Sequence, residues 1–145
     1  RLAAGGLLLI DYGYSRREYY HVERHMGTLL AHFRHRAHDD VLSCPGLQDI
    51  TANVDFSAVA QAGITAGLQL AGYTTQAQFL IDAGIDQLLA ASDPGAVAEH
   101  YALVTGVKRL MLPSEMGERF KALLLTRGVP VPVPGFGGRD LRDRL

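Results

Sequence analysis

The feature that most constrains this chain is an unbroken apolar run at residues 7–10, which ends in Asp11, Tyr12, Gly13 and Tyr14. Unbroken apolar runs are typical of strands that are covered on both faces, as in a parallel sheet. Ligands of such sheets bind just beyond the carboxyl ends of the strands. We therefore expect Asp11, Tyr12 and Tyr14 to lie where chemistry takes place. A plain buried strand whose Asp11 only caps a loop is the simpler interpretation, and it stays open.

The composition indicates an ordinary globular domain with room for one hydrophobic core. The chain has 145 residues, of which 48% are hydrophobic and 20% are charged. Its formal net charge of -1 provides no basic field, so we expect no nucleic-acid partner. Cys44 is the only cysteine, which excludes an internal disulfide. No apolar run approaches the roughly 20 residues that span a bilayer, so we expect no membrane span.

The position of the apolar strand predicts that this chain is part of something larger. Residues 7–10 follow Arg1 within a few positions, and nothing before them in the sequence supplies a neighbouring strand or a covering helix. A strand buried on both faces needs both. We therefore expect this chain to be the C-terminal part of a longer protein.

The pattern after the strand predicts an inserted loop and then a βαβ crossover. Residues 15–53 are polar and show little periodicity, which is typical of a long functional loop. Asp55 is a suitable N-cap for a helix that stops at Gly67. A second strand follows at residues 68–72, and Thr75 with Gln78 forms a capping-box sequence for the next helix.

The remaining segments predict one more helix, a third strand and a tail. Pro94 at a first helical position begins a helix that runs to about Met111, with Val97, Tyr101 and Val104 on its buried side. Residues 120–126 form the third strand. The tail at residues 129–145 starts with alternating Val and Pro, which favours an extended conformation, and its last residues are expected to be solvated.

Two clusters of polar residues are candidates for chemistry. His32, His35 and His38, with the acids that follow them, are of metal-ligand type, but their spacing fixes no geometry. Histidines that position a polar substrate, or that simply hydrogen-bond within a folded loop, are the preferred interpretation. Asp39, Asp49 and Asp55 are carboxylates that could pair bidentately with a guanidinium group, so an arginine side chain is a suitable guest. Asp49 and Asp55 also fit turn and cap positions, and for Asp55 we favour the cap.

Six segments, in order and spacing, resemble the C-terminal half of the MidA family of class I S-adenosylmethionine-dependent methyltransferases. They cover roughly residues 5–128 and read LLIDYGY (8–14), GTL (27–29), HRAHD (35–39), PGLQDITANVDF (45–56), GYTTQAQFL (72–80) and SEMGERFK (114–121). The family includes a mitochondrial protein arginine methyltransferase that assists assembly of respiratory complex I. The resemblance thus implies a transferase that uses S-adenosyl-L-methionine.

The resemblance also implies an α/β fold, the C-terminal part of a seven-stranded Rossmann-like sheet. Residues 7–10 would be strand five, residues 68–72 strand six, and residues 120–126 an antiparallel strand seven between them. Residues 1–128 would be the C-terminal part of the methyltransferase domain, and residues 129–145 a Pro/Gly/Arg-rich tail. The family's glycine-rich turn and ribose-binding acid do not occur in this sequence, so we assign no cofactor-binding residue and expect the chain alone to be inactive.

On this basis we expect the chain to carry the substrate side of a protein arginine N-methyltransferase acting in respiratory complex assembly. The expected catalytic residues are Asp11, Asp39, His35 and His38. The expected substrate-binding residues are Tyr12, Tyr14, Arg36, Gln48, Asp49 and Thr51. The expected partner is a protein that presents an arginine side chain, and a homodimer stays open. The expected location is cytoplasmic, or mitochondrial in eukaryotic relatives.

Two other classes of protein remain as alternatives. A non-catalytic binding or assembly protein could use the same fold to hold a partner. A metal-dependent hydrolase could be built on His32, His35 and His38, although we expect no metal.

Overall fold

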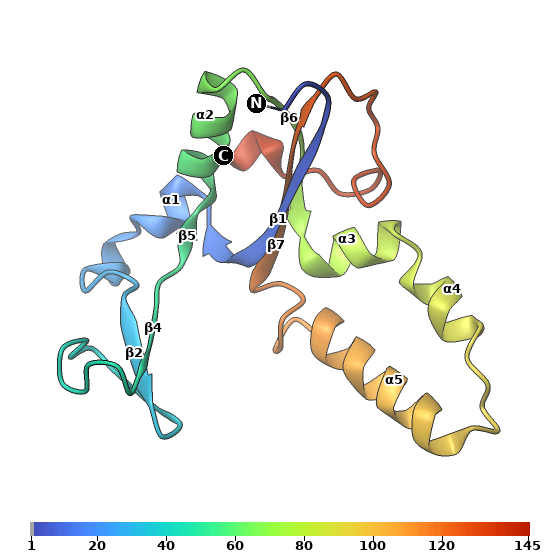
Figure 1. Ribbon diagram of the computed structural model, residues 1–145, viewed down its shortest axis with the longest axis horizontal. Helices are drawn as coiled ribbons and strands as arrows, with labels where there is room; N and C mark the ends of the chain where they lie inside the picture. Colours follow the sequence, from blue (N-terminus) through green and yellow to red (C-terminus); the bar gives the residue numbers. More distant parts are fainter. Residues whose placement is uncertain (1) are drawn as a thin grey trace.

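The computed structural model describes residues 2–145, whose centre is a four-stranded sheet (Figure 1). The strand order is β5-β1-β7-β6, and β7 runs antiparallel to both of its neighbours. This confirms the predicted order of the three long strands, with the last strand of the chain inserted between the other two. The bounds of the strands are Gly5–Tyr14 for β1, Val54–Asp55 for β5, Gln69–Thr75 for β6 and Phe120–Arg127 for β7.

One edge of β1 is largely unpaired within the described residues. The strand pairs with β7 from Gly5 to Tyr12, but it meets β5 only at Gly13 and Tyr14. Leu7, Leu8 and Ile10 remain 45%, 43% and 42% exposed. The prediction that this apolar run is covered on both faces is therefore wrong within this chain, because the core packs on the face that carries Leu9, whereas Leu8 and Ile10 on the opposite face stay partly exposed among residues 2–145.

The core lies on one face of the sheet, under helix α2 (Phe56–Thr65). Phe56, Tyr73, Leu123 and Leu125 are at most 2% exposed, and Leu9 of β1 packs against this cluster. The helix begins as predicted: Asp55 Oδ1 accepts the N–H of Ala58 at 3.0 Å. It ends before Gly67, whose φ of +80° is a left-handed conformation that glycine adopts at little cost.

The segment between β6 and β7 forms three helices that extend away from the sheet (Figure 1). They are α3 (Gln76–Asp82), which Thr75 caps by accepting the N–H of Gln78, then α4 (Ile85–Ala90) and α5 (Val97–Met111). The prediction that Pro94 opens the last helix is wrong, since α5 starts at Val97. The predicted buried side is also wrong, because Val97 and Tyr101 are 73% and 72% exposed. Among residues 2–145, no helix combines the length and hydropathy needed to cross a bilayer.

Residues 15–53 fold into defined elements, which corrects the prediction of a long inserted loop. The segment holds α1 (Arg16–Tyr19), a 3₁₀ turn η1 (Val22–Arg24) and a second sheet in the order β3-β2-β4, which we call the β-arm (Figure 1). Its strands are β2 (Leu30–Phe33), β3 (Arg36–His38) and β4 (Asp49–Thr51). Strands of three or four residues are too short to show a period in the sequence.

The turn of the β-arm carries no sequence signal of its own. Arg34 and His35 connect β2 to β3 with φ values of +49° and +63°. A two-residue hairpin turn of type I′ has positive φ at both positions, and Asn-Gly or Asp-Gly are its usual sequences. Arg-His is not among them, so the hairpin could not be recognised before its geometry was known.

The tail returns to the sheet and is not simply solvated. The Leu141 N–H donates to the Tyr73 carbonyl at 2.8 Å, and the Leu141 side chain is 6% exposed. The ring of Phe136 lies where a side chain at position 72 would be, so Gly72 allows the tail to cross β6. The predicted solvation holds for the charged groups of η2 (Arg142–Arg144) but is wrong for the apolar side chains.

A pair of glycine substitutions tests the close approach of β5 to β1. A Cβ at Gly13 would collide with the Val54 carbonyl oxygen and lie 2.9 Å from Phe56 Cε2. We expect Gly13→Ala to lower the free energy of unfolding by about 1–3 kcal/mol, as overpacking does. Gly106→Ala is the matched control, because Gly106 lies in α5 and a Cβ there would meet no atom within 4 Å. This variant should raise the free energy of unfolding by up to about 1 kcal/mol. Urea unfolding of both variants measures these changes. An unchanged free energy of unfolding in Gly13→Ala would contradict the close approach of β5 to β1.

Candidate functional site

A cavity of about 420 Å³ lies at the carboxyl end of β1, where ligands of such sheets bind. Three parts of the chain meet around it: the end of β1, the base of the β-arm, and the turn that leads from α5 into β7. We call this space the strand-end cavity. Its walls are formed by Tyr12, Tyr14, Thr28, Leu30, His32, Thr51, Asn53, Glu115, Met116, Arg119 and Phe120.

The β1 wall presents two tyrosines because alternate residues of a strand point to the same face. Tyr12 packs edge-on against Phe120, the first residue of β7, with ring centroids 5.6 Å apart. The Arg24 guanidinium lies 4.1 Å from the centroid of the Tyr14 ring, a cation–π contact. The aromatic wall is thus held from both sides, by β7 and by the segment after α1.

The base of the β-arm forms the second wall. The Asn53 N–H donates to Thr28 Oγ1 at 3.2 Å, which joins the two ends of the arm. Leu30 and Thr51 are register partners across β2 and β4, and the Thr51 hydroxyl donates to the Leu30 carbonyl at 3.5 Å. These bonds connect the arm across its base, beside the end of β1.

The third wall is a tight turn that carries Glu115 and Arg119. A Cβ at Gly117 would collide with the Met111 carbonyl, so the turn can fold back onto the end of α5 only with glycine there. The Ala77 N–H donates to the Gly117 carbonyl at 3.0 Å, which ties the turn to the start of α3. The turn brings one carboxylate, from Glu115, and one guanidinium, from Arg119, beside the aromatic wall.

Three of the predicted site residues, Tyr12, Tyr14 and Thr51, line the strand-end cavity. Asp11 does not line it, because alternation directs its side chain to the opposite face of β1. Its Oδ1 accepts the Tyr12 N–H at 2.8 Å.

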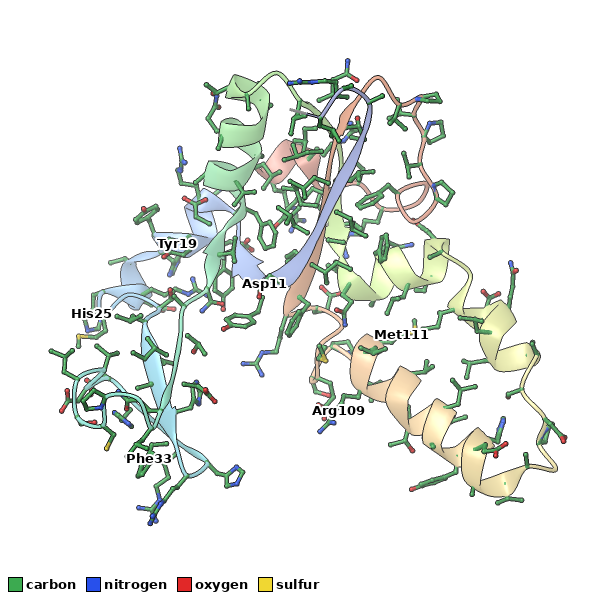
Figure 2. All side chains as sticks on the ribbon, in the orientation of Figure 1. Asp11, Tyr19, His25, Phe33, Arg109 and Met111 are labelled. Atoms are coloured by element: carbon green, nitrogen blue, oxygen red, sulfur yellow. The ribbon has the colours of Figure 1, made fainter. Side chains whose placement is uncertain are left out.

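The other predicted residues lie along the β-arm. His35 and Asp49 line an open depression on the arm, next to His32. Gln48 donates from Nε2 to the Val41 carbonyl at 2.5 Å. Figure 2 shows Phe33 at the far end of the arm, well away from Asp11. Arg36, its register partner, therefore lies at the far end as well, while His38 and Asp39 follow on β3 and the loop beyond it.

The structure thus separates the residues expected to act together. Asp11 lies near the end of β1, whereas His35, His38 and Asp39 lie on the β-arm. Their roles stay predictions. Asp55 caps α2 and pairs with Arg16 Nε at 3.4 Å, as a structural residue does.

The histidines of the arm do not converge. His32 is paired with Ala37, and His38 is paired with Ala31, so the two imidazoles leave opposite faces of the arm. His35 lies in the turn between the strands. Within the described part of the chain, no three His, Cys, Asp or Glu side chains are arranged to hold a metal ion. The geometry therefore gives the metal-dependent hydrolase no support.

Sequence reasoning missed the turn residues Glu115 and Arg119 and the arm residues Thr28 and Asn53 as parts of a site. No periodicity marks them, because they lie at the ends of elements and not within them. A usable signal did exist: all four lie in segments that resemble the MidA family.

Comparisons with known proteins identify relatives of this chain. Residues 1–74 match the family described as "Putative S-adenosyl-L-methionine-dependent methyltransferase". The chain is 39% identical over 127 residues to the zebrafish (Danio rerio) mitochondrial protein arginine methyltransferase NDUFAF7. The aligned region covers 81% of this chain and 26% of that protein. The chain is 37% identical over 134 residues to the Homo sapiens protein of the same name, covering 86% and 26%.

Two solved structures from Burkholderia thailandensis have the same fold. A COG1565 superfamily protein superposes with a TM-score of 0.94 at 45% identity, covering 99% of this chain and 38% of that one. A second COG1565 superfamily member, with bound S-adenosyl-homocysteine, gives a TM-score of 0.93 at 45% identity, and the match covers 97% of this chain and 36% of that one.

The chain spans about a quarter of the length of the curated relatives named above. The cofactor of the matched family is S-adenosyl-L-methionine, and the second Burkholderia structure holds its demethylated product. The expected resemblance is confirmed, and the chain belongs to this family of S-adenosyl-L-methionine-dependent methyltransferases, among the relatives of the NDUFAF7 enzymes.

Proposed function

We propose that this chain forms the methyl-acceptor side of a protein arginine N-methyltransferase. The observation that carries the proposal is the chemistry of the strand-end cavity, in which aromatic rings and a carboxylate surround one space. A guanidinium group is flat, permanently charged and weakly hydrated, so it stacks on aromatic faces and pairs with carboxylates. Tyr12, Tyr14 and Phe120 supply the faces, and Glu115 supplies the carboxylate, beside the Arg119 guanidinium that also lines the cavity.

The residues of the cavity have separable tasks. When bound, S-adenosyl-L-methionine supplies an electrophilic methyl group on a sulfonium. The aromatic wall confines the acceptor and keeps water from it, which favours in-line approach. Glu115 orients the guanidinium and draws its charge away from the attacking nitrogen. His32 is the histidine that lines this cavity, so we propose it ahead of His35 and His38 as the group that takes the released proton.

The strand ends of this chain fit only one side of a cofactor site. β1 leads through Ser15 into α1, and β6 leads through the Thr75 cap into α3, so neither turn is glycine-rich. The exposed apolar edge of β1 at Leu7, Leu8 and Ile10 is suited to a further strand. We propose that additional chain, such as the longer relatives possess, covers this edge and completes the sheet and the cofactor site.

The partner and location follow from the relatives and remain part of the proposal. The NDUFAF7 proteins are named mitochondrial protein arginine methyltransferases, which supports an arginine of another protein as the acceptor. A role in respiratory complex assembly, a homodimer and inactivity of this chain alone are proposed on the same family likeness. The proposed location is cytoplasmic, or mitochondrial as in the named eukaryotic relatives.

One observation favours the alternative of a binding or assembly role. The α5 helix has no buried residue, and its Val97 and Tyr101 side chains are open to solvent. An exposed apolar helix is often a contact surface. A longer protein with intact cofactor binding and no methyl transfer would fit this role.

Substitution of Glu115 tests the acceptor site. In the longer protein that carries this chain, we expect Glu115→Gln to lower kcat/KM for an arginine peptide by about 100-fold, because one preorganised charge is lost. Glu99→Gln, on exposed α5, is the matched control and should leave turnover unchanged. Equal turnover by Glu115→Gln and the unaltered protein would remove Glu115 from the mechanism.

Substitution of Asp11 tests the residue that the sequence singled out. We expect Asp11→Asn to abolish methyl transfer while cofactor affinity stays largely intact, since Asp11 lies near the carboxyl end of β1 and directly precedes Tyr12 of the acceptor cavity. Calorimetric titration with S-adenosyl-homocysteine, run beside the turnover assay, separates the two effects. Full turnover would show that Asp11 serves only its hydrogen bond to the Tyr12 amide.

A further inference from the structure

A second cavity, of about 240 Å³, lies at the same strand ends on the opposite face of the sheet. Lys121 and Tyr73 line it from that face, because Lys121 follows Phe120 in the strand and so points the other way. The tail closes it with Arg139 and Arg144. We call it the tail cavity. Tyr14 is the residue that lines both cavities.

The first sign of a ligand is a buried hydroxyl without a partner. The Tyr73 side chain is 2% exposed, and its hydroxyl makes no hydrogen bond to any described residue. Burial raises the pKa of the Tyr73 phenol, and the nearby Glu18 carboxylate raises it further, so the group stays a neutral donor. A buried donor without an acceptor destabilises a fold, and such a group needs an explanation.

The second sign is the charge around the tail cavity. Three cationic side chains line it against two acidic ones, Glu18 and Glu118, so its lining has an excess of positive charge. Glu18 is already engaged, since it accepts from the Ser15 hydroxyl at 3.0 Å and from the Ser15 N–H at 3.3 Å. Lys121 donates to the Glu118 carbonyl, and burial lowers its pKa.

The two guanidinium groups of the tail have no such engagement. Within residues 2–145, the side chains of Arg139 and Arg144 form no hydrogen bond and no ion pair, whereas Arg142 between them pairs with Asp140 at 2.6 Å. Arg144 and Tyr73 line the same cavity, so the two side chains lie near each other. Two free planar donor groups beside a donor hydroxyl match the lone pairs of an oxyanion.

We propose that the tail cavity binds a small oxyanion, a carboxylate or a phosphate, held by the Tyr73 hydroxyl and the guanidinium groups of Arg139 and Arg144. The proposal does not depend on methyl transfer, because none of these three residues lines the strand-end cavity. On this proposal the tail does more than pack against the sheet. Arg139 and Arg144 of the tail, together with the Tyr73 hydroxyl of β6, form the anion site.

The test is calorimetric titration of the longer protein, in one experiment with inorganic phosphate and in a second experiment with succinate. Saturable binding of either anion supports the site. The anion that binds shows whether the ligand is a phosphate or a carboxylate. Arg139→Gln should weaken that binding about tenfold or more, because it removes a charge-assisted hydrogen bond. Arg17→Gln is the matched control, since it removes the same charge from exposed α1 outside the cavity.

Tyr73→Phe separates binding from folding. Its hydroxyl has no partner in the fold, so the variant should unfold at the same temperature or higher while oxyanion affinity falls. Absence of binding of both phosphate and succinate would overturn the proposal. Binding that survives Arg139→Gln and Tyr73→Phe unchanged would overturn it equally, since the anion would then lie elsewhere.

Discussion

The structure depends on the antiparallel insertion of β7 between β1 and β6. Because β7 runs against its neighbours, its first residues arrive at the carboxyl ends of both strands. Phe120 therefore meets Tyr12, and the turn that carries Glu115 and Arg119 is delivered to the place where β1 ends. A parallel strand at this position would place that turn at the other edge of the sheet. One choice of strand direction thus assembles a site from segments a hundred residues apart.

Strand alternation then divides the strand ends into two chemically different spaces. Tyr12 and Phe120 face an aromatic cavity with one carboxylate and one guanidinium, while Lys121 and Tyr73 face a smaller cavity lined by more charged side chains. The division explains why Asp11 and Tyr12, adjacent in sequence, do not share a cavity. Tyr14 is the exception because it lies at the end of the strand, where both cavities reach it.

Close backbone approaches make this arrangement achievable. Gly13 lets β5 lie against the end of β1, Gly117 lets the turn fold onto α5, and Gly72 lets the tail cross β6. Gly13 and Gly72 lie where segments distant in sequence meet, whereas Gly117 lets the chain reverse within a few residues of the end of α5. The exposed edge of β1 is the one place where the sheet has apolar side chains without a neighbour in the described chain, in keeping with relatives several times longer.

The sequence by itself determined the three long strands, the Asp55 and Thr75 caps and the family, since runs of apolar residues, caps and ordered motifs are local signals. The candidate site was only partly predictable: Tyr12, Tyr14 and Thr51 line the cavity as expected, whereas Glu115, Arg119 and Asn53 lie in segments that resemble the family but follow no periodicity that marks them as site residues. The β-arm was missed because its strands are short and its Arg34-His35 turn lacks the usual glycine. Which side chains share a cavity was decided only by the tertiary structure, because strand pairing and alternation set the face to which each one points.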